Sequence, residues 1–173
     1  MIDMAIVKAN YTKSSGGAKA NIRYIQHRTG RDGVKIVRSL FGSDGTMNRG
    51  EAYRMIDDAE NGSVFFRLKI SPDPATEDTK RDLFLQEVTH KTLDTLEQRL
   101  GASVSYVASI HDDHTDIRHV HVLAIVKGRL NPADFKAMRE TATTVSLEQR
   151  QSRDQAEDLQ KGKGEEKQWE KGY

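Results

Sequence analysis

Residues 104–127 read VSYVASIHDDHTDIRHVHVLAIVK, and two alternating patterns in this segment frame a cluster of histidines. In the first half, apolar and polar residues alternate as far as His111, which is typical of a half-buried strand. In the second half, valine or alanine recurs at every other position from Val120 to Val126. The segment therefore predicts a β-hairpin whose two strands are joined by a long polar loop.

The hairpin gathers four of the six histidines of the chain within residues 111–121. Because side chains alternate along a strand, His119 and His121 point to one face, and the parity of the partner strand puts His111 on the same face. Three neutral imidazoles can bind a divalent cation and leave coordination positions open. The pattern predicts a metal site at these three residues. Two alternatives stay open: the loop residue His114 replaces His111, or the histidines only form hydrogen bonds.

Asp113 and Asp116 lie in the same loop, within reach of the predicted metal site. A carboxylate in such a place can orient an imidazole or act as a base. The simpler interpretation is that these acidic loop residues are only hydrated.

The composition of the 173 residues fits one core rather than two, with 36% hydrophobic residues. The chain has no Cys, so a metal must be bound by His, Asp or Glu. No apolar run approaches the roughly 20 residues that a membrane span needs, and the start of the chain lacks a basic flank followed by a long apolar run. We expect a cytoplasmic protein without a membrane span.

The charge of the chain is unevenly distributed. Residues 1–49 carry nine Lys and Arg against three Asp and Glu, an excess of +6, whereas residues 50–146 have a net charge of −4 and residues 147–173 of −1. A local basic patch can bind phosphate groups, as in nucleic acids. A solvated basic face is the alternative interpretation.

The rest of the chain alternates between the two periods of secondary structure. Apolar residues at Ala18, Ile22 and Ile25 have helical spacing, for example, and Gly101 would end a long helix. The expected strands are 5–9, 34–41 and 64–70, and the expected helices are 18–29, 49–60, 79–100 and 131–144, the last fraying past Thr144. We assign residues 1–146 to one domain. Residues 147–173 cannot form a core of their own and are expected to be a charged tail, either a solvated helix or a linker.

A resemblance to a known family rests on three of these features. The three histidines on adjacent strands resemble the metal motif of HUH endonucleases, and the first His, eight residues before the His-x-His pair, is similar in spacing to plasmid mobilisation relaxases of the MobA/MobL type. Those relaxases carry a Tyr on the first helix, after a strand and a Ser/Gly-rich loop; here residues 14–17 (SSGG) lead to Tyr24. Residues 61–70, followed by a Pro turn, also resemble the family. One departure is Arg118, where many relatives have Pro.

The resemblance covers residues 5–127 and implies a fold, a reaction and partners. The fold would be α/β, with a central antiparallel β-sheet, the His hairpin at its middle and helices packed chiefly on one face. The protein would be a metal-dependent DNA relaxase that nicks one strand at a transfer origin in plasmid mobilisation or conjugative transfer. Its cofactor would be Mn or Mg, and accessory relaxosome proteins are further expected partners. The expected contacts to the single-stranded DNA are Lys13, Lys19, Arg23 and Arg28, with Arg31, Lys35 and Arg38 as further candidates.

Two alternatives to the relaxase remain. A replication initiator of rolling-circle replication would share the HUH site and differ in the DNA that it recognises. A non-catalytic metal-binding or DNA-binding module would need no nucleophile, which makes the tyrosine-bearing helix an argument against it.

Five tyrosines compete for the role of nucleophile. The resemblance implies Tyr24, which would form a 5′-phosphotyrosine adduct, and its neighbours Arg23, His27 and Arg28 are basic. Tyr11, at a strand end, is the first alternative. Of the other three, Tyr106 is expected in the core and Tyr53 is expected to pack on a helix. Tyr173 ends the polar tail.

Overall fold

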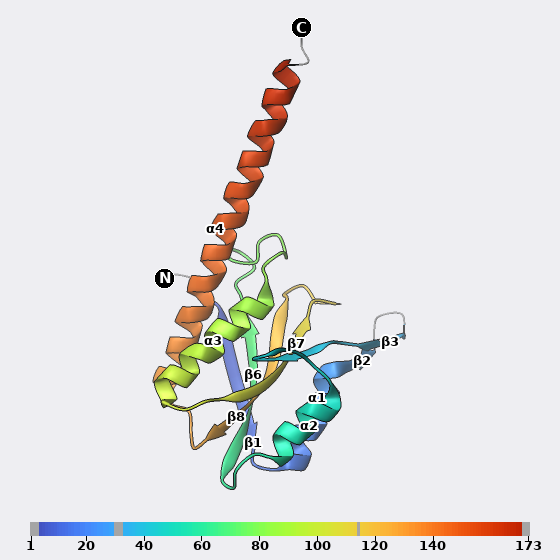
Figure 1. Ribbon diagram of the computed structural model, residues 1–173, viewed down its shortest axis with the longest axis vertical. Coiled ribbons are helices and arrows are strands. Elements are labelled where there is room, and N and C mark those ends of the chain that lie inside the picture. The colour runs from blue at the N-terminus through green and yellow to red at the C-terminus, as the bar shows by residue number, and fades with distance from the viewer. Residues whose placement is uncertain (1–3, 30–32, 114, 171–173) are drawn as a thin grey trace.

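A computed structural model describes residues 4–29, 33–113 and 115–170, and the side chains of all of these except residues 28, 29 and 164–170. The protein has the predicted α/β fold, built on a six-stranded antiparallel sheet (Figure 1). The predicted hairpin lies inside this sheet and forms two of its neighbouring strands. In spatial order the strands are β1 (Ile6–Thr12), β6 (Ser63–Ser71), β8 (His119–Lys127), β7 (Ser105–His111), β4 (Leu40–Gly42) and β5 (Gly45–Met47).

Two helices, α3 (Leu85–Leu100) and α4 (Pro132–Glu170), cover one face of the sheet. The apolar row that was predicted from Val120 to Val126 faces them and is buried, which confirms the predicted parity of this strand. Burial of such a row stabilises the fold by roughly 25 cal/mol for each Å² of apolar surface. The opposite side chains of the same strands must therefore point to the other face.

The other face is covered only in part, by α1 (Ser15–Gln26) and α2 (Arg49–Asp57). The predicted helical stripe is confirmed: Ala18, Ile22 and Ile25 are at most 1% exposed. These side chains pack with α2 against sheet residues such as Leu123, in a second, smaller core. Two helices thus pack on each face, rather than chiefly on one, and part of the second face stays open.

Several element boundaries differ from the predictions. The strand expected over 34–41 is split into β3 (Lys35–Val37), which pairs with β2 (His27–Thr29) in a separate two-stranded sheet, and β4. The reason is that the side chains of Val34 and Val37 are exposed, whereas those of Leu40 and Phe41 are buried in the core.

The helix expected from residue 79 begins instead at Leu85. The Asp78 carboxylate accepts a hydrogen bond from the backbone N of Leu83 and holds the preceding segment in a non-helical loop. At its other end the helix stops at Gly101, which has the positive φ of 64° expected of a C-cap glycine.

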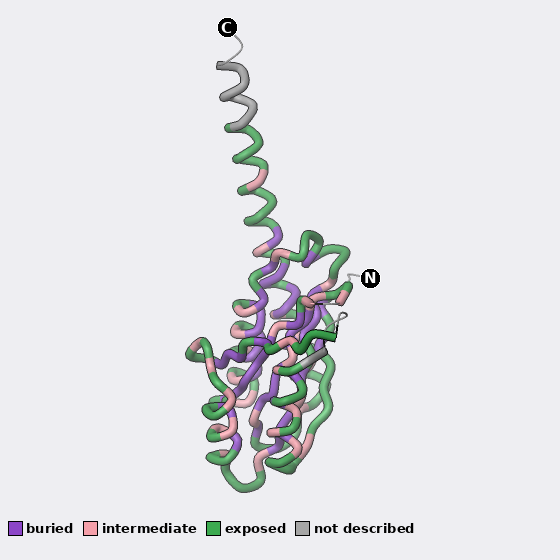
Figure 2. The backbone as a smooth tube through the Cα atoms, turned by 90° about the vertical axis from the view of Figure 1, so that its right-hand side faces the viewer, coloured by how far each residue is buried: buried purple, intermediate pink, exposed green. Residues whose placement is uncertain are grey.

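Helix α4 was expected to fray past Thr144. It continues instead to Glu170 and projects far beyond the body of the protein (Figure 1). Arg150 explains the continuation, because its side chain is 7% exposed and bonds to the Asp82 carboxylate at 2.6 Å. From Gln151 to Lys163 the helix is largely exposed (Figure 2).

The domain boundary at residue 147 stays a prediction. Within the described part of the chain, no helix combines the length and the apolar character of a membrane span.

Candidate metal site

The structure brings the three predicted histidines together on β7 and β8. His111 lies directly opposite His119, and His121 lies opposite Ser109 in the same antiparallel pair. The ring centroids are 4.3 Å to 5.2 Å apart, and one nitrogen of each ring lies within 4.8 Å of the other two. These residues could hold a metal ion. The alternative ligand His114 lies outside the described residues.

Backbone oxygens fix which nitrogen of two of these rings carries the proton. His111 Nε2 lies 3.0 Å from the carbonyl oxygen of Ile25, and His119 Nδ1 lies 2.9 Å from that of Ile117. A carbonyl oxygen only accepts, so both nitrogens must donate, and the lone pair of each neutral ring is on its other nitrogen. Hydrogen bonds of this kind orient the imidazoles of metal sites.

His111 has the properties of a metal ligand. Burial, and then positive charge at His121, Arg38 and His119, together lower its pKa to about 3, so the ring is neutral at ordinary pH. Its Nδ1 is buried and has no hydrogen-bond partner among the described residues. An unpartnered buried nitrogen is costly. A divalent cation held between the three rings would satisfy it, so the residues present fit such an ion.

Asp113, one of the two predicted acidic neighbours, is held by Arg38. The guanidinium lies 2.8 Å to 3.0 Å from both carboxylate oxygens, and the Arg38 side chain is 5% exposed. Burial raises the pKa of Asp113, but the hydrogen bonds and charge of Arg38, together with a backbone hydrogen bond and the charge of His111, outweigh it and hold that pKa below its usual value. The pair therefore ties the loop after His111 to the body of the protein, and Arg38 is turned inward rather than toward a ligand.

Two further arginines clamp the loop between the histidines. Arg81 donates to the backbone oxygens of Asp116 and Asp112, at 2.8 Å and 3.1 Å. Arg118, directly before His119, lies 3.1 Å from the Asp78 carboxylate, and both of these side chains are nearly buried. Arg118 thus anchors the loop to the segment before α3.

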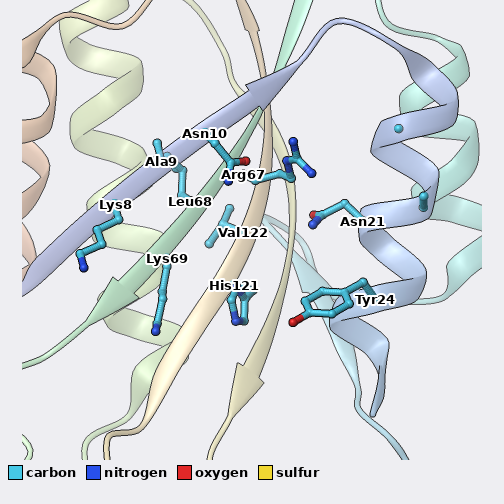
Figure 3. Close-up of a pocket in the computed structure, with 12 residues that line it drawn as sticks. Lys8, Ala9, Asn10, Asn21, Tyr24, Arg67, Leu68, Lys69, His121 and Val122 are labelled. Carbon is cyan, nitrogen blue, oxygen red and sulfur yellow. The ribbon is translucent and has the colours of Figure 1, made fainter.

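Tyr24 projects from α1 into the same site. It is 71% exposed and lines a cavity of about 760 Å³ together with His121. Figure 3 shows its hydroxyl pointing toward His121. The predicted nucleophile therefore shares a cavity with one of the three predicted metal ligands.

The Ser/Gly-rich loop explains how α1 is seated there. The Ser14 hydroxyl caps the helix by accepting a hydrogen bond from the backbone N of Gly17, at 2.9 Å. A Cβ on Gly17 would lie only 2.8 Å from the Thr12 hydroxyl oxygen. Only glycine therefore allows the first turn of α1 to approach the end of β1 so closely.

The other tyrosines lie elsewhere. Tyr11 is 59% exposed, but it is paired with Phe66, whose ring belongs to the core under α3 and α4, so Tyr11 points away from the histidines. Tyr106 is buried and contacts His90, as expected for a core residue. Tyr53 packs on the smaller core and accepts a hydrogen bond from Arg23. Tyr173 lies outside the described residues.

Among the basic residues predicted to contact DNA, the described side chains of Lys13, Lys19 and Arg23 do not line the cavity. Lys19 pairs with Asp57 at 2.7 Å, and Arg23 donates to the hydroxyl of Tyr53 at 3.0 Å, so both face α2. Lys13 is exposed, and the side chain of Arg28 lies outside the described residues. Their role in DNA binding stays a prediction.

Three other cations line the cavity with Tyr24 and were missed in the sequence: Lys8, Arg67 and Lys69. The alternation of side chains along a strand could have identified them. Arg67 and Lys69 alternate with the buried Phe66, Leu68 and Ile70, which places both on the face of the histidines.

Comparison of the chain with family models, curated proteins and solved structures gives no match.

Proposed function

We propose that this protein is a metal-dependent relaxase, which nicks single-stranded DNA through Tyr24 and becomes covalently attached to the cut strand. The observation that carries the proposal is the shared cavity of Tyr24 and His121. An exposed tyrosine beside three convergent imidazoles has the parts that phosphodiester cleavage needs, namely a nucleophile and a place for a cation.

The residues of the chain have distinct tasks in this reaction. The Tyr24 hydroxyl loses its proton as its oxygen forms a bond to phosphorus, the bond from phosphorus to the 3′-oxygen breaks, and that oxygen leaves as a 3′-hydroxyl after taking up a proton. A divalent ion at His111, His119 and His121, Mn²⁺ or Mg²⁺, would stabilise the negative charge on the non-bridging phosphate oxygens. The 5′-phosphotyrosine conserves the energy of the broken bond, so a 3′-hydroxyl can later reseal the strand.

The fixed position of α1 supports Tyr24 as the nucleophile. Ile25, the next residue, accepts the hydrogen bond from His111, so the backbone beside the tyrosine is tied to one of the imidazoles. Reactions of this kind depend on alignment to within about 1 Å. A helix held by both its N-cap and this bond meets that need better than a loop does.

The test is a cleavage assay on a pool of random-sequence single strands with Mn²⁺, resolved on a denaturing gel. The wild-type protein is expected to give a band of protein bound to DNA, and Tyr24→Phe is expected to give none, because it loses only the hydroxyl. Tyr11→Phe, whose side chain is similarly exposed on the opposite face, is the matched control and should form the band. Equal adduct formation by Tyr24→Phe would contradict the proposal.

A further inference from the structure

We infer that β1 and β6 carry a nucleotide-binding site beside the histidines, which holds one nucleotide of the DNA strand with its phosphate on Lys8 and Lys69 and its base in an adjoining cavity. The inference rests on the proposed function for the kind of ligand. It goes beyond it by assigning residues to a part of the strand away from the bond that is cut.

The first argument is a pair of like charges. Lys8 lies directly opposite Lys69 in the β1–β6 pair, and Lys69 lies opposite His121 in the β6–β8 pair. One row across the open sheet face therefore reads Lys8, Lys69, His121. Like charges directly opposite each other destabilise a sheet. Neither lysine forms an ion pair with a carboxylate anywhere in the described ranges, so a bound anion is what would offset their repulsion.

Arg67 adds a third cation in the next row of the same face, opposite Asn10. Its Nε is buried and has no hydrogen-bond partner among the described residues, although a guanidinium has five N–H groups to donate. Figure 3 shows Lys8 and Lys69 projecting side by side, and Arg67 between Asn10 and Asn21. The three cations thus follow the cavity from Tyr24 toward the edge of the sheet, as a strand of phosphates would require.

The second argument is that a different cavity begins at the same two lysines. A cavity of about 720 Å³ is lined by Lys8 and Lys69 and extends away from Tyr24. Its apolar walls include Ile6 and Ile117, which are 49% and 44% exposed. The other apolar walls are Met4, Pro72 and Pro74. Exposed apolar side chains next to paired cations offer a surface for a base next to a site for its phosphate.

The carboxylates of this second cavity fix the orientation of the nucleotide. Asp73 and Asp116 line it, together with Ser71 and Thr115. Negative charge disfavours a phosphate inside the cavity, but a carboxylate accepts hydrogen bonds from the amino group of a base. The phosphate therefore lies on the lysine pair and the base lies in the cavity.

The experiment measures DNA binding without cleavage, using the full chain carrying Tyr24→Phe and loaded with Mn²⁺. Fluorescence anisotropy compares an oligocytidylate strand with a strand of equal length whose residues are abasic. The parent protein should bind the oligocytidylate more tightly. Lys8→Gln with Lys69→Gln should weaken binding of both strands about tenfold and reduce the slope of log affinity against log salt by about 0.7, because one phosphate contact is lost.

Two further double variants make the result specific. Ile6→Ala with Ile117→Ala should weaken only the binding of the oligocytidylate and abolish the preference over the abasic strand. Lys91→Gln with Lys136→Gln, two exposed lysines of α3 and α4, should change neither affinity. Thermal unfolding checks folding, and loss of Lys8 and Lys69 should leave the free protein at least as stable, because their repulsion is removed.

Either of two results overturns the inference: the Lys8 and Lys69 variant binds like the Lys91 and Lys136 control, or the parent binds the abasic strand as well as the oligocytidylate. Absence of measurable binding by the parent also counts against it. Failure of the proposed function is distinguishable, because it appears as a missing covalent adduct in the cleavage assay while the binding differences persist.

Discussion

His111 Nε2 donates a hydrogen bond of 3.0 Å to the carbonyl oxygen of Ile25, and this bond joins the histidine cluster to the helix that carries Tyr24. The two residues are 86 positions apart in the chain. The bond has two effects, because it leaves Nδ1 of His111 as the nitrogen with the lone pair and it fixes the backbone next to the tyrosine. A change that moves His111 should therefore disturb both metal binding and the position of Tyr24.

The first prediction concerns the ligands of the metal. His119→Ala should remove most of the binding of Mn²⁺, and His111→Ala should weaken it more than His114→Ala, because strands fix ligand geometry better than a loop does. Calorimetric titration of the three variants measures this. The exposed His27 provides a control, since His27→Ala should bind as the wild type does. Loss of binding in His114→Ala with binding retained in His111→Ala would show that the ligand set is wrong.

The second prediction concerns the clamp on the loop. The Asp78 side chain is 4% exposed, and Arg118→Met removes the guanidinium that pairs with its carboxylate. The change therefore leaves a buried negative charge without a counter-charge. The free energy of unfolding should fall by roughly 3 kcal/mol, and the affinity for Mn²⁺ should fall as His119 loses its support. Chemical denaturation and calorimetry measure the two effects.

A double variant separates loss of the clamp from loss of the side chain. Adding Asp78→Asn to Arg118→Met should restore part of the stability, because no unpaired charge remains buried. Arg129→Met, at an exposed arginine, should cost little. If Arg118→Met alone unfolds like the wild type, the ion pair does not anchor the loop.

The third prediction concerns the contact between α4 and the segment before α3. The hydrogen bond from Arg150 holds the pKa of Asp82 below its usual value. A carboxyl whose pKa is lower in the folded state adds stability above its unfolded pKa of about 3.9, and this stability is lost as the pH falls through the folded value. Asp82→Asn should thus cost roughly 1 kcal/mol at neutral pH and progressively less in acid.

Urea unfolding at several pH values checks the third prediction. The difference between wild type and Asp82→Asn should shrink as the pH falls below about 4. Glu148→Gln, at an exposed glutamate of α4, should differ little in stability from the wild type at any pH. A cost of Asp82→Asn that stays constant across the range would mean that the ion pair with Arg150 is not its cause.

The sequence was sufficient for features that depend on local periodicity. The parity of the hairpin placed His111, His119 and His121 on one face, and the helical stripe at Ile22 and Ile25 identified the buried side of α1. Both follow from the fixed geometry of strands and helices. Tyr24 came from the resemblance to relaxases and from its basic neighbours, and the structure puts it in the cavity of His121.

The remaining features depend on contacts between distant residues. The partners of Lys19 and Arg23, Asp57 and Tyr53, belong to a helix about 30 residues later, and spacing cannot reveal such partners. The pairing of Lys8 with Lys69 likewise depends on which strands are neighbours. The length of α4 was missed because its support comes from long-range contacts with residues 80–84, such as the ion pairs of Arg150 with Asp82 and of Lys80 with Asp154.

The central claim is that Tyr24 attacks the phosphate, and the most direct measurement identifies the residue that carries DNA after cleavage. The adduct formed by the wild-type protein with Mn²⁺ is digested and its peptides are sequenced by mass spectrometry. The account predicts one modified peptide, with a 5′-phosphate on the oxygen of Tyr24, and no adduct when the metal is withheld. Cleaved DNA without any attached peptide, or a phosphate on Tyr11, would contradict it.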